Sequence, residues 1–201
     1  MAIRAEEVKK LRSRTGQGMM ECKRALEEAG GDLDQAVEVL RKKGLATAEK
    51  RASRSTAEGR VQSYIHHNGK VGVLIEVNCE TDFVARNEQF QQFLSDLCLH
   101  ICAASPTAVT REDVAQDLVE TERRIAREQM ADQKKPDNII DKIVEGKLNK
   151  WYSHIVLLEQ PFVKDEDRTI QDLLKDTIVQ IGENIVIKRF VRFEVGETDT
   201  D

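Results

Sequence analysis

The residues best suited to chemistry are the histidine pair His66-His67 and the cysteines Cys98 and Cys102, which bracket His100. The two cysteines lie four residues apart and so share one face of a helix, but His100 points away from that face. No second Cys/His pair follows at the spacing of a zinc site. Free cysteine is among the most buried residue types, so the sequence predicts buried, inert thiols and no metal site.

Nucleotide-binding and nucleophile motifs are missing from the sequence. It has neither a Gly-x4-Gly-Lys phosphate loop nor a Gly-x-Gly-x-x-Gly turn between a strand and a helix. His66-His67 has no serine or cysteine near it in the setting of a catalytic nucleophile. We therefore expect a protein that binds other molecules, that uses no cofactor, and that is not an enzyme.

Composition excludes further classes of protein. The 201 residues carry a net charge of -5, which argues against nucleic-acid binding over the whole surface. The longest apolar runs, such as Val71–Val77, are far shorter than the roughly 20 residues that cross a bilayer. Met1–Glu7 resembles neither a secretory signal nor a transit peptide, and four irregularly spaced cysteines do not make a disulfide scaffold. A soluble cytoplasmic location is expected.

Charge and periodicity divide the chain into two domains. Residues 1–52 have 12 basic and 9 acidic residues, a net charge of +3, whereas the remainder has 19 and 27, a net charge of -8. Three short helices are predicted in the first domain, the last beginning after the cap Asp32 and ending at Gly44. A basic linker over 53–60 follows, and it is either solvated charge or a nucleic-acid-binding arm.

Residues 61–201 predict an α+β core, in which a small antiparallel sheet packs with helices and a helical hairpin. Asn68-Gly69 predicts a β-hairpin, and a helix follows from Phe90. The remaining elements are expected, in order, as two paired charged helices over 112–130 and 137–150, a strand over 154–158, a helix over 170–181 and a last strand over 185–195.

Phe83 and Val84 form an unusual apolar pair, because they lie beside Asp82 in what should be a polar turn. Phe83 lies seven residues before Phe90, so it could begin the buried stripe of the following helix. Alternatively, it could be an aromatic anchor on a loop, held by a rigid sheet and aimed at a partner. Composition does not decide between the two.

Met19 and Met20 raise the same question in the helical domain. Neighbouring residues on a helix are about 100° apart, so both side chains cannot face one small core. At least one is expected to be exposed, and methionine adapts well to binding surfaces. The alternative is partial burial of both in an imperfect bundle.

Two stretches resemble the two signatures of the elongation factor Ts family. They are residues 15–26 (TGQGMMECKRAL) and 76–86 (EVNCETDFVAR). The match continues through 181–185 (IGENI) and 192–196 (RFEVG), so it covers nearly the whole chain. The resemblance implies a guanine-nucleotide exchange factor for elongation factor Tu in translation elongation, which binds the GDP form and releases GDP so that GTP can bind.

The resemblance also implies which residues contact the partner. The first domain would be a ubiquitin-associated-like three-helix bundle, docked on the nucleotide domain of the GTPase through Met19, Met20 and Lys23. The loop Thr81-Asp82-Phe83-Val84 would insert beside the Mg²⁺ site of the GTPase and disturb the metal and phosphate site. His67 approximately matches a histidine that approaches the phosphate loop.

In one respect the chain departs from longer family members, which carry two related core subdomains in tandem. This chain has room for one, so it resembles a short form in which one copy serves both purposes. We therefore expect a homodimer that binds two GTPases in a 2:2 complex, with no membrane partner and no direct nucleic-acid contact. A hypothesis from another class is an adaptor that binds a ubiquitin-like modifier or RNA through the bundle and linker.

Overall fold

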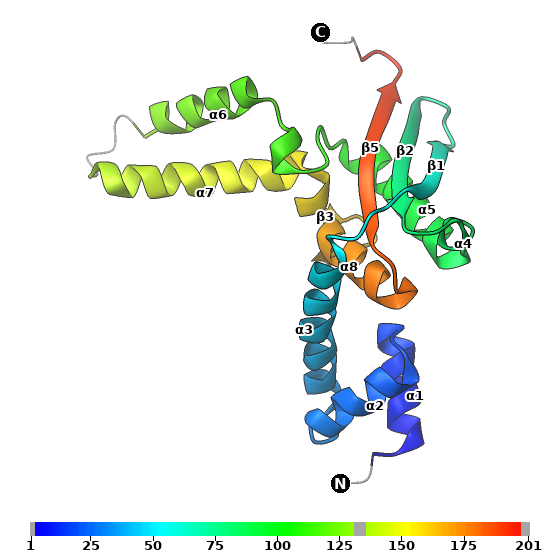
Figure 1. Cartoon of the computed structure of the whole chain (residues 1–201). Coiled ribbons are helices and arrows are strands. Elements are labelled where there is room, and N and C mark those ends of the chain that lie inside the picture. Colours follow the sequence, from blue (N-terminus) through cyan, green and yellow to red (C-terminus); the bar gives the residue numbers. More distant parts are fainter. Residues whose placement is uncertain (1–2, 131–135, 198–201) are drawn as a thin grey trace. The chain divides into compact units, whose positions relative to one another are not determined.

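A computed structural model describes residues 3–130 and 136–197, and the contacts of the chain divide it into two compact units. The first unit comprises residues 1–60, 77–93 and 174–186; the second comprises residues 61–76, 94–173 and 187–201. Each unit is therefore built from segments that are distant in the sequence. The predicted α+β class is confirmed, with helices and a small antiparallel sheet (Figure 1).

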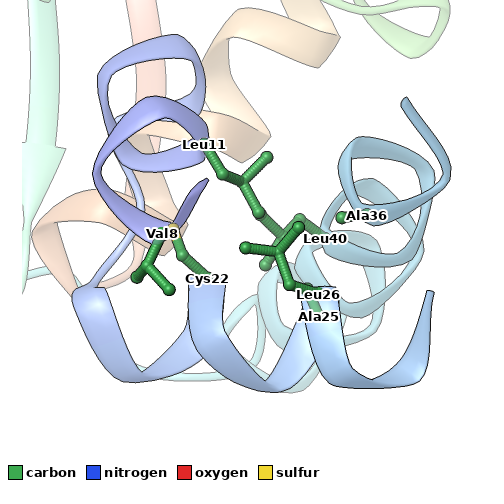
Figure 2. Packing of buried hydrophobic residues seen from close by; sticks show 7 residues of the cluster. All are labelled: Val8, Leu11, Cys22, Ala25, Leu26, Ala36 and Leu40. Atoms are coloured by element: carbon green, nitrogen blue, oxygen red, sulfur yellow. The ribbon is translucent and has the colours of Figure 1, made fainter. Parts of the chain in front are cut away.

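The chain begins with the three predicted helices, α1 (Ala5–Thr15), α2 (Met19–Glu28) and α3 (Leu33–Arg51). The Asp32 carboxylate accepts hydrogen bonds from the backbone N–H groups of Asp34 and Gln35 at 2.8 and 2.9 Å, which confirms the predicted N-cap of α3. The helices enclose a small apolar core drawn in Figure 2, which consists of Val8, Leu11, Cys22, Ala25, Leu26, Ala36 and Leu40.

The predicted end of the third helix at Gly44 is wrong, because α3 continues to Arg51. Glycine inside a helix costs about 1 kcal/mol relative to alanine, which contacts elsewhere can offset. A Cβ placed on Gly44 would lie 3.5 Å from Val179, so the helix packs closely there. Arg51 donates a hydrogen bond to the Ile178 carbonyl at 2.8 Å. These contacts with a segment more than 120 residues away prolong the helix.

The main sheet has the strand order β1-β2-β5, formed by β1 (Glu58–Ile65), β2 (Val71–Cys79) and β5 (Ile185–Glu194). The Asn-Gly hairpin is confirmed, since the turn glycine Gly69 has φ 68° and the His66 N–H donates to the Val71 carbonyl at 2.9 Å. The Val195 N–H donates to the Lys70 carbonyl at 2.9 Å, so β5 runs antiparallel to β2.

Helix α5 (Glu88–Ala104) supplies five of the twelve largest fully buried side chains among the residues that the structure describes. The predicted stripe is confirmed at helical spacing by the burial of Phe90, Phe93, Leu94, Leu97 and Ile101. The Cys98 thiol lies 3.9 Å from the carbonyl of Gln62 in β1, and burial raises its pKa to about 12.

All four cysteines are buried and free, as the sequence predicts. Within the described chain, no group of three or more His, Cys, Asp or Glu residues is arranged to hold a metal ion. Among residues 3–130 and 136–197, no helix combines the length and apolar character needed to cross a bilayer.

The predicted pair of charged helices is confirmed as α6 (Gln116–Glu128) and α7 (Asp137–Ile155), which lie side by side in Figure 1. Arg127 pairs with Asp141 at 3.2 Å, and Arg123 pairs with Glu145, so the helices run antiparallel. The apolar contact between them is formed by Ala126, Val144 and Leu148. The predicted start at residue 112 is too early, because Arg111–Asp113 forms a separate 3-10 turn.

The strand predicted over 154–158 is wrong. Helix α7 continues to Ile155, and a 3-10 turn, η2 (Leu157–Glu159), follows it. Val156 forms only an isolated bridge with Ala108. Val156 and Leu157 are buried, and a short apolar run is compatible with either helix or strand.

A small hairpin, β3 (Pro161–Phe162) with β4 (Asp165–Thr169), precedes the predicted helix α8 (Ile170–Ile181). Close to this hairpin, the fully buried His100 joins α5 to the segment after α7. Its Nε2 lies 2.9 Å from Gln160 Oε1, and the Val163 N–H donates to its Nδ1 at 3.4 Å. A neutral ring with its proton on Nε2 satisfies both hydrogen bonds, and burial lowers the pKa of His100.

We predict that His100 makes the stability of the fold sensitive to acid. Its pKa is lower in the folded chain than its ordinary value of 6.5, so the unfolded chain binds this proton more readily. The stability it contributes is therefore present above pH 6.5 and is lost as the pH falls further. Urea unfolding should show His100→Gln to be about 1–3 kcal/mol less stable than the wild type at pH 8, with a smaller difference at pH 5. A difference that stays constant over this range would contradict the assignment.

Candidate functional site

The turn after β2 carries an unusually exposed aromatic side chain. Phe83 is 81% exposed, whereas the next two residues, Val84 and Ala85, are each only 9% exposed. Residues Asp82–Ala85 form a one-turn helix, α4, and the Thr81 hydroxyl caps it by accepting the Val84 N–H at 3.4 Å. The turn thus buries one side and presents Phe83 to solvent.

Of the two interpretations of Phe83, burial at the start of the α5 stripe is wrong. Phe90 is fully buried, but α4 and α5 are separate helices, and Arg86 and Asn87 lie between them. Seven-residue spacing places two side chains on one face only when the helix between them is continuous. The exposure that an anchor needs is therefore present, and contact with a partner stays a prediction.

Asp82 lies beside Phe83 and keeps its carboxylate accessible. It pairs with Arg86 at 3.0 Å, and the two side chains are 46% and 78% exposed. An ion pair this open to water contributes at most about 1 kcal/mol. Little free energy therefore opposes its replacement by a partner's cation or water.

Glu183, between α8 and β5, holds the base of the turn, and the sequence did not identify it as a site residue. Its Oε2 accepts hydrogen bonds from the backbone N–H groups of Glu80 and Thr81 at 3.1 and 3.0 Å, and its Oε1 accepts the Thr81 hydroxyl at 2.7 Å. Burial and the nearby Glu183 charge raise the pKa of the Cys79 thiol to about 11. The partners are 102 to 103 residues apart in the chain, so no local pattern could reveal this contact.

Met19 and Met20 begin α2, and both are exposed, by 38% and 60%. The prediction that at least one would be exposed is confirmed. Lys23 follows one turn later with its side chain 52% exposed and its ammonium group 3.8 Å from Glu27. These three side chains are accessible to a partner, while the neighbouring Cys22 belongs to the helical core.

His67 lies in the hairpin turn between β1 and β2 and is exposed. Its ring centroid is 4.2 Å from that of His66, whose Nδ1 lies 3.1 Å from the Tyr64 hydroxyl. His67 belongs to the second compact unit, whereas Phe83 and the two methionines belong to the first. His67 is accessible, and its contact with a partner stays a prediction.

A family model and curated relatives that resemble this chain all carry the same description, elongation factor Ts. Residues 22–197 match the family model described as Elongation factor TS. The chain is 57% identical over 197 residues to the elongation factor Ts of Geotalea uraniireducens, covering 98% of this chain and 91% of the relative. It is 55% identical over 195 residues to that of Thermosipho melanesiensis, covering 97% and 100%. The elongation factor Ts of Thermoanaerobacter sp. strain X514 is 53% identical, with coverage of 97% and 96%.

The different positions of the two phenylalanines lead to a stability prediction. Phe83→Ala should change the free energy of unfolding by no more than about 0.5 kcal/mol, because the side chain is mostly in water. Phe90→Ala, the matched control, should cost about 3–5 kcal/mol through the cavity it leaves. Urea denaturation of both variants measures the difference. A large loss in Phe83→Ala would mean that the ring packs against the protein.

Proposed function

The chain belongs to the elongation factor Ts family, and we propose that it is the guanine-nucleotide exchange factor for elongation factor Tu in translation elongation. The observation that carries the proposal is Phe83, a large aromatic side chain left 81% exposed on a short turn at the end of a strand. Residues 15–26 and 76–86 provide further support through the family signatures. A cytoplasmic location, where translation takes place, is part of the same proposal.

In the proposed mechanism, Thr81–Val84 inserts beside the nucleotide site of elongation factor Tu in its GDP form. Bound GDP is held by a phosphate loop and by Mg²⁺, which demands near-octahedral oxygen geometry. The Phe83 ring would wedge between packed elements of the GTPase. The Asp82 carboxylate would disturb the hydrogen-bonded water shell of the metal. Small displacements there weaken the binding of both Mg²⁺ and GDP.

Exchange then follows from thermodynamic linkage and needs no bond chemistry. If this protein binds the empty GTPase more tightly than the GDP form, its binding must weaken the affinity of the GTPase for GDP by the same ratio. The factor changes the rate of exchange and not its overall equilibrium, so GTP can fill the empty site. In this role the chain is not an enzyme and needs no cofactor.

The other predicted contacts complete the proposal. Residues 1–52 would dock on the nucleotide domain through Met19, Met20 and Lys23, which are exposed at the start of α2. His67, exposed in the hairpin turn, would approach the phosphate loop. Residues 53–60 would link this bundle to the α+β core and dimerisation domain over 61–201.

We predict that the double variant Asp82→Ala/Phe83→Ala loses most of the acceleration of GDP release, by about tenfold or more, because the inserting groups are gone. Stopped-flow release of a fluorescent GDP from elongation factor Tu measures this. Glu88→Ala/Gln89→Ala, two exposed positions just after the turn, is the control and should leave the rate unchanged. Unchanged release in the first double variant would show that the loop assignment is wrong.

The homodimer is the second part of the proposal, and the outer face of the sheet supports it. In β2 the exposed Leu74 lies between the buried Val73 and Ile75. A hollow of about 330 Å³ lies on this face beside Val61, Leu74 and Val191. Exposed apolar side chains occur on all three strands, namely Val61, Ile65, Leu74, Val191 and Phe193. Contiguous apolar surface of this kind is typical of protein interfaces.

We predict a dimer in sedimentation-velocity measurements and a 2:2 complex with elongation factor Tu. Leu74→Asp should shift the chain towards monomer, because a dimer would bury the new carboxylate without a partner. Leu118→Asp is the matched control, since Leu118 is similarly exposed, 51% against 45%, but lies on α6. A stable wild-type monomer that is fully active one-to-one would refute the dimer.

A further inference from the structure

The turn that presents Phe83 has little to hold it in place locally. Helix α4 is four residues long, far below the roughly 12 residues at which an isolated helix becomes even marginally stable. Its local hydrogen bonds are those of a single turn. The Ala85 and Arg86 N–H groups donate to the Thr81 and Phe83 carbonyls at 3.3 Å, the Asn87 N–H donates to the Val84 carbonyl at 2.9 Å, and the Thr81 cap is at 3.4 Å. The pair between Asp82 and Arg86 is exposed. Whatever positions Phe83 must therefore come from another part of the chain.

Glu183 provides that support with three hydrogen bonds to the residues immediately before α4. One carboxylate oxygen accepts the N–H groups of both Glu80 and Thr81, and the other accepts the Thr81 hydroxyl. These donors lie just beyond Cys79, the last residue of β2. Hydrogen bonds to a charged acceptor are about twice as strong as neutral ones. The Thr81 hydroxyl also accepts the Val84 N–H, so the interaction extends into α4.

A reciprocal contact runs in the other direction. The Glu80 carboxylate accepts the Asn184 N–H at 2.6 Å and pairs with Arg54 at 3.4 Å. Asn184 is only 2% exposed, and its side-chain amide donates to the carbonyls of Ala52 and Arg54 at 3.3 and 2.9 Å. The segment after β2, the segment before β5 and the chain after α3 are thus joined at one point.

From this geometry we propose that Glu183 is a positioning residue, which holds the Thr81–Val84 turn in the conformation that presents Phe83 and Asp82. Its relevance to nucleotide exchange rests on the proposed function. Glu183 acts through Thr81 and Glu80, and it need not touch the partner. Removing its carboxylate leaves two backbone donors and one hydroxyl without their acceptor, so the turn samples other conformations. Binding must then select the productive conformation from several.

Amide hydrogen exchange tests the first step on the chain alone. In Glu183→Ala, the Thr81 amide should exchange at least about tenfold faster than in the wild type, because its acceptor is gone. Glu183→Gln keeps one oxygen acceptor and should retain most of the protection. Glu159→Ala is the matched control, since Glu159 is also a partly buried carboxylate, bonded to Arg111 at 2.7 Å. It should not change exchange at Thr81. Unchanged exchange in Glu183→Ala would overturn the proposal.

The second test is a double-mutant cycle on the rate of GDP release from elongation factor Tu. Glu183→Ala should reduce the acceleration about tenfold, and Glu183→Gln should restore it to within about threefold of the wild type. In a background that already carries Asp82→Ala/Phe83→Ala, Glu183→Ala should have little further effect, because the two side chains that the turn presents are already gone. An equal loss in both backgrounds would overturn the proposal, since Glu183 would then act through general stability or another contact.

The two tests separate this inference from the proposed function. If the wild-type chain does not accelerate GDP release, the exchange role fails, while the Thr81 amide still reports whether Glu183 holds the turn. If Glu183→Ala does not fold, Thr81→Val provides the comparison. Thr81→Val removes the hydroxyl that donates to Glu183 and accepts the Val84 N–H, and it should lose activity without changing the protection of the Glu80 amide. Full activity of Thr81→Val would overturn the proposal. So would fast exchange of the Glu80 and Thr81 amides in the wild type.

Discussion

The hydrogen bonds that Glu183 accepts at the end of β2 are the interaction on which the presentation of the candidate site depends. A phenylalanine ring left in water gains nothing from its own contacts, so its position must be imposed by the backbone that carries it. Glu183 accepts from that backbone, and Glu80 returns a contact to Asn184. The turn can therefore be short and still be placed, because its base is tied to segments more than 100 residues away.

Phe83 is one of several large apolar side chains that are exposed to water. Three groups of them are Met19 and Met20, Phe83, and the outer face of the sheet around Leu74 and Phe193, while others, such as Leu118, lie on α6 and elsewhere. None of these is needed to fill a core, since the helical bundle and α5 have their own buried sets. Surface of this kind costs free energy in water unless another molecule covers it. Its distribution is consistent with a protein that functions by contact with other proteins.

Much of the fold could be predicted because its signals are local. The cap at Asp32, the turn at Asn68-Gly69 and the buried stripe of α5 each depend on residues within one or two turns of each other. The predictions failed where a distant segment decided the outcome. Helix α3 passes Gly44 because residues 178 and 179 pack against it, and the apolar run at 155–158 joins a helix end and a 3-10 turn in place of a strand.

The same distinction applies to the candidate site. The sequence by itself determined the family, the α+β class, the buried cysteines, and the candidate residues Asp82, Phe83, Met19 and Met20, because these depend on residue types and short spacings. Only the tertiary structure decided that Phe83 faces water while Phe90 is buried. It alone also placed Glu183 where it accepts hydrogen bonds from Thr81, at the base of the turn that carries Phe83. The physical reason is that exposure and hydrogen-bond partnership are properties of what surrounds a residue in space. Periodicity reports only the neighbours on one helix or strand.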